Sequence, residues 1–402
     1  MTQRILIVGA GFAGLWAALG AARLLELNGR PAGAVEIALI APEALLHMRP
    51  RLHEADPAGM TAPLLPLLQA AGVRFVQGRV ERIHSADAMV EAVDEAGQRF
   101  SLGYDRLVLT SGSRLFRPAV PGLREHAFSI DQLDEAAALD RHLAGLTALP
   151  ASAARDTVVV VGGGFTGIEI AAELPARLRG LLGAAGGRVI VVEQAESIGP
   201  DLGAGPRPVI EQALAALGVE CRLGAAVTAI DGDGLLTARG ERIAAKTVIW
   251  TGGMRASPLT EQIPAKRDRF GRLAVARDLR VPGVAGLFAA GDVAHAQLDE
   301  HGNHALMSCQ HAINMGRYAG YNVAADLLGL PTLAYTQEQY VTCLDLGSWG
   351  AVYTEGWARE IKLQGADAKA LKRQINTAWI YPPQADRQAA LAAADPAVSV
   401  VA

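Results

Sequence analysis

Two glycine-rich turns carry the clearest chemical signal in the sequence. The first, Gly9-Ala-Gly11-Phe-Ala-Gly14, follows an apolar run, and so does the second, Gly162-Gly-Gly164-Phe-Thr-Gly167. In such a turn the first glycine makes the bend, the second lets the backbone approach a diphosphate, and the third lets the following helix pack on the strand. The diphosphate then sits on free N–H groups at the helix start. The two turns therefore predict two dinucleotide sites.

The uncharged stretch from Ile5 to Ala22 also has the features of a secretory signal peptide or a membrane anchor. The second turn decides between these interpretations. Its helix carries Glu169 and Glu173, two carboxylates that do not suit a bilayer span. No other uncharged run reaches spanning length, so we do not expect a transmembrane protein, and peripheral attachment stays open.

The elements that must position these turns are those of an α/β fold. Short β-branched runs precede both turns, Ala- and Leu-rich stretches follow them, and second strands are expected at Ile37–Ile40 and Val189–Val192. With 50% hydrophobic and 19% charged residues, the composition suits buried parallel sheets with helices on both faces. We therefore predict two Rossmann-like dinucleotide-binding domains.

The two units also resemble each other at their ends, which indicates an internal repeat of domain size. One closes with the strand Tyr104–Leu109 and the other with Thr247–Trp250, each followed by a turn of Thr and Gly. A further buried strand ends at Gly291 and Asp292, and a helix with small residues for close packing is expected over residues 308–328. Short strands are expected within residues 73–100. From Thr332 we expect a small β-containing region with a disordered tail.

Charge and cysteine usage exclude several classes of protein. The net charge is −4 and there is no basic run, so binding of DNA or RNA is not expected. Cys221, Cys309 and Cys343 are far apart and odd in number, which predicts free thiols rather than a disulfide framework or a CxxC metal site. The nine histidines do not cluster at ligand spacing, and we predict no structural metal. A reducing cytoplasm suits this pattern.

An acidic residue at the end of the second strand normally binds the ribose hydroxyls of an adenine nucleotide. Glu193 has this place in the second unit, and no arginine lies nearby in the sequence to pair with a 2′-phosphate. NADH is therefore favoured over NADPH. In the first unit the position is Ala41, and either Glu43 or water reaches the ribose; alternatively, Glu43 is a solvated loop charge.

Taken as a set, these motifs resemble the two-dinucleotide flavoprotein reductases. The set comprises both glycine turns, Thr110–Gly112 before Pro121-Gly122, Trp250–Pro258, Gly271-Arg272 and Phe288–Asp292. The segment Trp250–Pro258 and the order of the motifs are most similar to the type II NADH dehydrogenases. The resemblance covers about residues 1–325, and the C-terminal region matches less well.

The resemblance implies a glutathione reductase-like FAD/NAD architecture with a small C-terminal α+β region. Its expected parts are 1–117 and 271–328 for the FAD-binding domain, 118–149 for a connector, 150–270 for the NADH-binding domain and 329–402 for the C-terminal region.

It also implies roles for particular residues. Gly9, Gly11 and Gly14 would hold the FAD diphosphate, while Asp292 would bond the ribityl chain and Gly291 would allow the backbone to approach it. Gly162, Gly164 and Gly167 would hold the NADH phosphates, and Glu169 would lie near the nicotinamide unless it is an exposed helix charge. The remaining predicted cofactor-binding residues are Phe12, Ala13, Arg49, Thr110, Ser111, Gly112, Thr166, Gly253 and Gln310.

The implied reaction is hydride transfer from NADH to FAD, with the cofactors carrying the chemistry. Many reductases of this class pass electrons on to a CxxxxC pair, but the corresponding loop, His47–Glu54, contains no cysteine. A quinone, a diffusible carrier or oxygen remains as acceptor. The type II enzymes line the quinone site with Ala-Gln-x-Ala-x-Gln, where this chain has Gln310 and the shorter Asn314. We predict both as catalytic residues, with packing roles as the alternative.

Three further questions stay open. The basic and aromatic segment Lys369–Tyr381 is either a helix at the membrane surface, at its inner face, or a solvated helix packed on the body of a cytoplasmic protein. The chain is a monomer or a homodimer. Besides an NADH:quinone dehydrogenase, it could be a soluble NADH-dependent reductase for a protein carrier or small molecule, or a non-catalytic flavoprotein that senses NADH.

Overall fold

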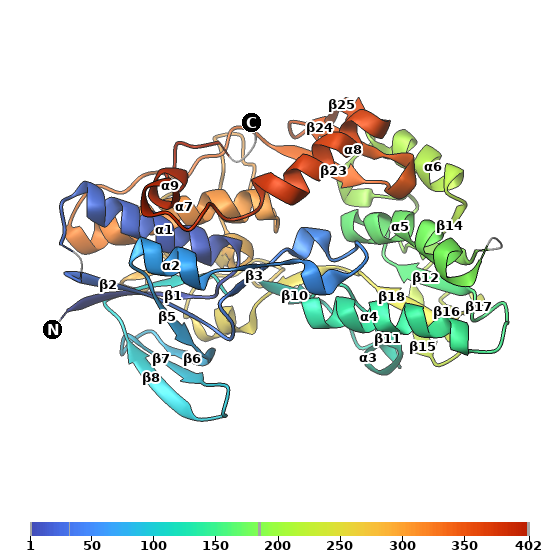
Figure 1. Ribbon diagram of the computed structural model, residues 1–402, viewed down its shortest axis with the longest axis horizontal. Coiled ribbons are helices and arrows are strands. Elements are labelled where there is room, and N and C mark those ends of the chain that lie inside the picture. Colours follow the sequence, from blue (N-terminus) through green and yellow to red (C-terminus); the bar gives the residue numbers. More distant parts are fainter. Residues whose placement is uncertain (1, 32, 184–185, 400–402) are drawn as a thin grey trace.

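The computed structural model describes residues 2–31, 33–183 and 186–399. Two parallel sheets of five strands each form the two halves of the molecule (Figure 1). The first has the order β21 (Leu287–Ala289), β9 (Arg106–Leu109), β1 (Gln3–Val8), β2 (Val35–Ala41), β5 (Arg74–Gln77). The second has the order β11 (Ala127–Phe128), β18 (Thr247–Trp250), β12 (Thr157–Val161), β13 (Arg188–Val192), β14 (Val219–Arg222). The predicted α/β class is confirmed.

Helices cover one face of each sheet, and a three-stranded antiparallel sheet covers the other, so the expectation of helices on both faces was wrong. These covering sheets are β6 (Arg79–His84), β7 (Met89–Val93) and β8 (Arg99–Gly103), and β15 (Val227–Asp231), β16 (Gly234–Thr237) and β17 (Arg242–Ala244). Tight turns at Gly97 and Gly240, both with positive φ, favour meanders over helical crossovers here. The short strands expected within residues 73–100 are confirmed.

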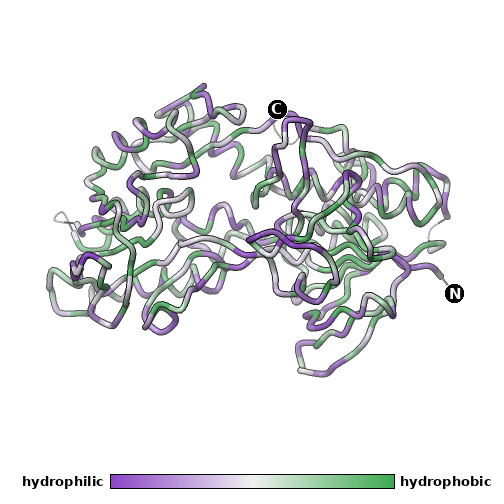
Figure 2. Tube along the Cα trace, turned by 180° about the vertical axis from the view of Figure 1, so that it is seen from behind, coloured by the Kyte–Doolittle hydropathy of each residue, from purple (hydrophilic) through white to green (hydrophobic). Residues whose placement is uncertain are grey.

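The strand β12 shows how both faces are buried. Val158 and Val160 point to the helical side, whereas Val159 and Val161 pack with the covering sheet β15–β17, and all four are buried. Figure 2 shows hydrophobic segments gathered inside each half, with hydrophilic ones mainly on outer loops. The helices are α1 (Phe12–Leu27), α2 (Leu65–Ala71), α3 (Leu123–His126), α4 (Leu133–Gly145), α5 (Phe165–Leu182), α6 (Arg207–Ala216), α7 (Cys309–Leu328), α8 (Gly365–Gln374) and α9 (Arg387–Ala393).

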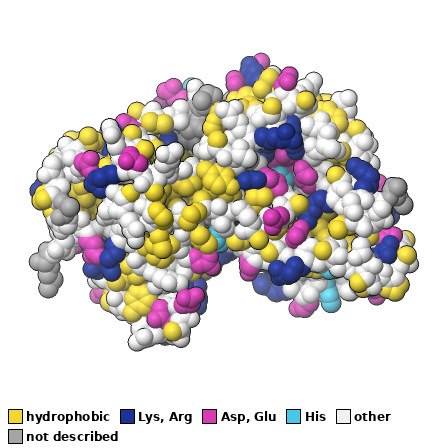
Figure 3. Space-filling view, in the orientation of Figure 1, with side chains coloured by type: hydrophobic (Ala, Val, Ile, Leu, Met, Phe, Trp, Pro, Cys, Tyr) yellow, Lys and Arg dark blue, Asp and Glu magenta, His cyan; other side chains and the backbone are white. Residues whose placement is uncertain are grey.

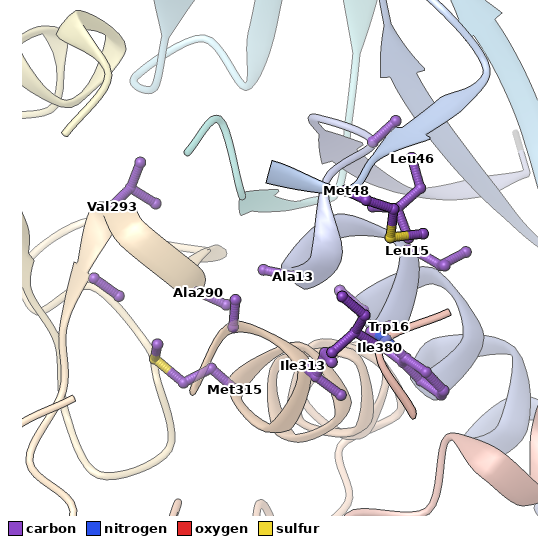
Figure 4. Packing of buried hydrophobic residues seen from close by; sticks show 14 of the residues in the cluster. Ala13, Leu15, Trp16, Leu46, Met48, Ala290, Val293, Ile313, Met315 and Ile380 are labelled. Atoms are coloured by element: carbon purple, nitrogen blue, oxygen red, sulfur yellow. The ribbon is translucent and has the colours of Figure 1, made fainter. Parts of the chain in front are cut away.

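Helices α1 and α7 run side by side in the same direction, with backbone against backbone. A Cβ on Gly316 would lie 2.5 Å from the carbonyl oxygen of Ala13, and one on Gly320 would overlap the carbonyl of Ala17. Figure 4 shows Trp16 of α1 close to Ile313 of α7. The close packing predicted from the small residues is confirmed, and both helix N-termini consequently lie at the same edge of the first sheet.

The C-terminal region returns to both halves of the molecule. The sheet β23 (Val341–Asp345), β24 (Ala351–Glu355) and β25 (Glu360–Gln364) packs with α8 on α5 (Figure 1). Helix α9 then packs on α1 and α2, where Arg387 pairs with Glu26 at 2.6 Å. The expected disordered tail is therefore wrong for residues 386–399, because α9 buries Ala390 and Leu391 there; residues 400–402 lie outside the described residues.

Three short two-stranded sheets complete the fold. They pair β3 (Leu45–His47) with β4 (Thr61–Pro63), β10 (Ser113–Leu115) with β19 (Met254–Ala256), and β20 (Leu273–Ala274) with β22 (Ala294–His295). The pair β10–β19 joins the end of the first unit to the end of the second. Within the described ranges, every helix is too short or too polar to cross a bilayer.

Candidate functional site

The first glycine turn leaves one open position between two crowded ones. Gly9 has φ +112°, and a Cβ there would lie 2.5 Å from the carbonyl oxygen of Thr110; a Cβ on Gly14 would overlap the carbonyl of Gly9. A Cβ on Gly11 would meet no atom within 4 Å. Gly11 is the N-cap of α1, and no side chain caps the helix. Open space beside free N–H groups is what a diphosphate requires.

The second turn repeats this geometry. Gly162 has φ +109°, a Cβ on Gly167 would overlap the carbonyl of Gly162, and Gly164 is open within 4 Å. The threonine at the end of the neighbouring strand does the same in both units. The hydroxyl of Thr110 donates to the carbonyl of Val8 at 2.8 Å, and that of Thr251 donates to the carbonyl of Val161 at 3.0 Å. The two turns thus have matching geometry, and we call Gly9–Gly14 the first cradle and Gly162–Gly167 the second cradle.

Polar side chains gather beside the first cradle. The Ser113 hydroxyl donates to Asp292 Oδ2 at 2.6 Å, and Arg49 Nη1 lies 3.6 Å from the same oxygen. Gly291 has φ +73°, and a Cβ there would lie 2.8 Å from the Cβ of Ala13 at the start of α1. The hydroxyl of Ser111 is buried without a hydrogen-bond partner. This arrangement suits a polar ligand that extends from the diphosphate, and it gathers predicted site residues from four segments of the chain.

Glu193 lies buried at the carboxyl end of β13, beside the second cradle. Its two carboxylate oxygens accept hydrogen bonds from the backbone N–H groups of Gly163, at 2.6 Å, and Ala195, at 2.7 Å. A Cβ on Gly163 would lie 3.2 Å from Glu193 Cβ, a tight contact, so glycine eases the close approach of the two residues. The carboxylate is held in one orientation, with lone pairs left to accept ribose hydroxyls. Its contact with ribose stays a prediction.

Glu43 differs from Glu193. Its side chain is 59% exposed, and its carboxylate lies 3.7 Å from His47 Nε2. That exposure favours the solvated loop charge, and a contact between Glu43 and an adenine ribose stays a prediction.

Glu169 is buried, so its interpretation as an exposed helix charge was wrong. Lys372 Nζ donates to Glu169 Oε1 at 2.8 Å, the N–H of Asp345 donates to the same oxygen at 3.0 Å, and His53 Nδ1 lies 3.6 Å from Oε2. Lys369 Nζ in turn donates to Asp345 at 2.5 Å. We call these five residues the Glu169 cluster. They join α5, the loop 47–54 and the C-terminal region in one ionic network.

The buried partners of Glu169 are the part of the site that the sequence did not reveal. Burial acts to lower the pKa of Lys372, but the charge of Glu169 and its hydrogen bond raise that pKa above its usual value. Lys372 therefore stays charged inside the protein. Lys372 is buried in the body of the protein and cannot contact a membrane surface. Its burial argues against the interpretation of Lys369–Tyr381 as a helix at the membrane surface. In the surface view, charged side chains of both signs gather right of centre, beneath α8 (Figure 3).

Comparison with known proteins agrees with this geometry. Residues 3–316 match the family described as pyridine nucleotide-disulphide oxidoreductases. The chain is 49% identical over 399 residues to an NADH dehydrogenase-like protein of Mycobacterium tuberculosis strain H37Rv, with 98% of each chain covered. The chain belongs to the pyridine nucleotide-disulphide oxidoreductase family.

A more distant relative and a solved structure extend the comparison. The demethylphylloquinone reductase of Synechocystis sp. is 30% identical over 383 residues, covering 92% of this chain and 91% of the relative. The structure of NDH2 from Plasmodium falciparum in complex with NADH has a TM-score of 0.78 and 14% identity, and it covers 98% of this chain and 97% of that one. That likeness shows the fold. The chain is thus a member of this oxidoreductase family that resembles NADH dehydrogenases.

Despite the family name, the cysteines of this oxidoreductase do not form a reactive pair. All three are free. Burial raises the pKa of the Cys309 thiol to about 11 and that of the Cys343 thiol to about 12. Such thiols are poor nucleophiles, because the thiolate is the reactive form. Within the described ranges, no group of three His, Cys, Asp or Glu side chains is arranged to hold a metal ion.

Gln310 and Asn314 lie on one face of α7, together with Asn322, and all three hold the extended segment 333–341. Gln310 donates to the carbonyl of Val341 at 2.7 Å and accepts from its N–H at 3.4 Å. Asn322 donates to the carbonyl of Leu333 at 2.8 Å and accepts from its N–H at 2.7 Å. We call these side chains the amide ladder. The geometry supports the packing roles for Gln310 and Asn314, and their part in catalysis stays a prediction.

Proposed function

We propose that this oxidoreductase is an FAD-dependent NADH dehydrogenase that passes hydride from NADH to FAD and electrons on to a quinone. The observation that carries the proposal is the pair of matching cradles at Gly9–Gly14 and Gly162–Gly167, each with a single open glycine. Two dinucleotides held at the ends of two sheets can place a nicotinamide against a flavin. The relationship to a demethylphylloquinone reductase supports a quinone as acceptor.

FAD fits the first cradle because the polar groups beyond it have capacity left. The orphaned hydroxyl of Ser111 can bond a ligand, and Asp292 is held by Ser113 where the ribityl chain would pass. Arg49 Nη1 lies 3.6 Å from the same Asp292 oxygen, and a hydrogen bond from Arg49 to Asp131 at 2.5 Å holds the guanidinium in place. When bound, the flavin would accept a hydride and release electrons singly or in pairs, chemistry that no side chain here supplies.

NADH fits the second cradle, with Glu193 fixed to accept ribose hydroxyls and with an uncompensated carboxylate facing any 2′-phosphate. Thr166 and Gly253 complete the predicted contacts. Glu169 follows the turn closely on α5 and would face the nicotinamide from within its cluster. Hydrogen bonds from Lys372 and from the N–H of Asp345 fix its carboxylate, so we assign it to orienting the ring and excluding water.

A protein carrier is the second candidate acceptor. The amide groups expected to line a quinone pocket, those of Gln310 and Asn314, already hold the backbone of the C-terminal region. A quinone that used them would have to release Val341 and Thr336 first. A protein carrier that receives electrons at the surface would leave the hydrogen bonds to Val341 and Thr336 intact.

The deciding experiment starts from the purified protein with its native cofactor. The absorbance of bound flavin is first followed as NADH is added without oxygen. One of four oxidants is then added: a short-chain quinone, an acidic carrier protein, oxygen or an organic disulfide. We expect bleaching by NADH and rapid recovery with the quinone. A colourless protein, or bleaching without recovery in any arm, would contradict the proposal; the second outcome would indicate a sensor of NADH.

A further inference from the structure

The pair β10–β19 carries two arginines directly opposite each other. Its antiparallel register places Arg114 beside Arg255, and both side chains are exposed. Residues opposite each other on one face have Cβ atoms about 5 Å apart, and like charges there are destabilising. Such a pair persists more easily where a ligand of opposite charge compensates it.

Aromatic rings, rather than carboxylates, hold two of the guanidinium groups on this surface. Arg255 Cζ lies 4.2 Å from the centre of the Phe116 ring, and Arg269 Cζ lies 4.6 Å from that of Phe270. The N–H of Ala256 donates to the carbonyl of Phe270 at 2.9 Å, so the segments that carry the two ring–arginine pairs lie side by side. A ring orients a guanidinium without neutralising it and leaves its N–H groups free. We call Arg114, Arg255, Arg269, Phe116 and Phe270 the arginine platform.

The platform differs from its surroundings in charge. Among the described residues, no carboxylate lies within ion-pair distance of Arg114, Arg255 or Arg269. Nearby arginines do have such partners: Arg117 pairs with Glu135 at 2.6 Å and Arg272 with Asp268 at 2.7 Å. The platform therefore concentrates positive charge on a chain whose net charge is −4.

The reverse face of the same two strands borders the first cradle. Side chains alternate between the faces of a strand, so Ser113 and Met254 point away from the arginines. Ser113 donates to Asp292 at 2.6 Å, and its hydroxyl lies 3.7 Å from Met254 Sδ. The arginine platform is thus separated from the proposed FAD site by the thickness of one two-stranded layer.

We propose that the arginine platform docks an acidic electron-carrier protein, which takes electrons through the β10–β19 layer; this rests on the proposed function. Each NADH would reduce two one-electron carriers: NADH + 2 carrier(ox) → NAD⁺ + H⁺ + 2 carrier(red). Arginine and aromatic residues together are typical of the energetic centres of protein interfaces. A compact platform of this kind suits a small acidic protein better than a lipid surface, which favours broad clusters of basic residues.

The test reverses the charge of the platform and of a matched pair elsewhere. R114E/R255E is compared with R30E/R141E, which makes the same charge change at two exposed arginines that are not part of the platform. NADH oxidation is measured with an acidic [2Fe–2S] ferredoxin, an acidic flavodoxin and a neutral short-chain quinone. We expect kcat/KM for the acidic carriers to fall roughly tenfold or more in R114E/R255E at low salt and to fall in the wild type as salt is added. The quinone activity of both variants should match the wild type.

Each outcome bears on one proposal. Equal loss in both double variants, no loss in either, or failure of the wild type to reduce either acidic carrier would overturn the docking proposal while quinone turnover persists. Binding of phosphatidylglycerol vesicles that R114E/R255E abolishes, without an effect on the carriers, would also overturn it and assign the platform to an anionic membrane. If no acceptor is reduced at all, the proposed function fails instead.

Discussion

Lys372 Nζ lies 2.8 Å from Glu169 Oε1, although the two residues are 203 positions apart in the chain. Both are buried, and each belongs to a different part of the molecule. Through this pair the C-terminal region is fastened to the helix that starts at the second cradle. Removing one partner would leave the other charged and unpaired in the interior, which is the costly way to alter a buried ion pair.

We therefore expect Lys372→Met to lower the free energy of unfolding by about 3–5 kcal/mol, because Glu169 is left without its cation. The double variant K372M/E169Q should recover much of this loss, since no unpaired carboxylate then remains at that position. Urea denaturation at neutral pH measures both. A double variant no more stable than K372M would show that the pair has no direct coupling.

His311 predicts a pH dependence of stability. Burial and, to a smaller extent, the charge of Arg272 lower the pKa of this histidine from 6.5 to about 3. Between these values the unfolded chain binds a proton that the folded chain does not, so stability is fully present above pH 6.5 and is lost as the pH falls towards 3. The expected slope from this group is at most about 1.4 kcal/mol per pH unit.

The measurement is the free energy of unfolding at pH 5 and pH 7.5 for the wild type and His311→Asn. The variant cannot take up this proton, so its loss on acidification should be smaller by about 2 kcal/mol. Equal losses in both proteins would mean that His311 is protonated with its ordinary affinity in the folded state.

The open glycines allow the two cofactor sites to be separated. Gly11 has φ −71°, which alanine adopts readily. An added methyl group would meet no protein atom within 4 Å and would occupy the space expected for a diphosphate. We expect Gly11→Ala to fold with an unchanged melting temperature of the apoprotein but to lose flavin on purification. Gly164→Ala should retain flavin and raise KM for NADH by roughly tenfold or more, from steric exclusion of a diphosphate.

Gly14→Ala is the contrasting variant, because its Cβ would overlap the carbonyl of Gly9. It should lower the melting temperature itself. Stoichiometric flavin in Gly11→Ala, or an unchanged KM for NADH in Gly164→Ala, would mean that the diphosphates bind elsewhere.

The amide ladder predicts local changes in hydrogen exchange. Gln310→Ala and Asn322→Ala each remove a side chain that bonds both backbone groups of one residue, at Val341 and Leu333 respectively. We expect faster amide exchange across residues 333–341 in both variants. Gln374→Ala, at an exposed position on α8, is the matched control and should leave that exchange unchanged. Unchanged protection in Gln310→Ala would contradict the packing role of Gln310 and favour its predicted role at the site of the electron acceptor.

The sequence alone determined the repeated part of this protein. Strand, turn and helix of each cradle are contiguous, so glycine spacing and β-branched runs specify them locally. Small residues in the helix over residues 308–328 indicated close packing, but the partner helix α1 and the parallel direction came from the tertiary structure. The residues gathered around the cradles, such as Asp292 and Glu193, stand at strand ends that parallel sheets bring to one edge.

Only the tertiary structure decided what the C-terminal region does. Separate elements pack so that Lys372 meets Glu169 and Val341 meets Gln310. No local sequence pattern specifies such a contact between distant segments, and the same holds for Arg114 and Arg255 on β10 and β19. A lysine in a basic, aromatic segment has the same local sequence whether it faces water, a membrane or a buried glutamate. Which of these it meets depends on the free energy of burying its charge, and that is set by the partner the fold brings to it.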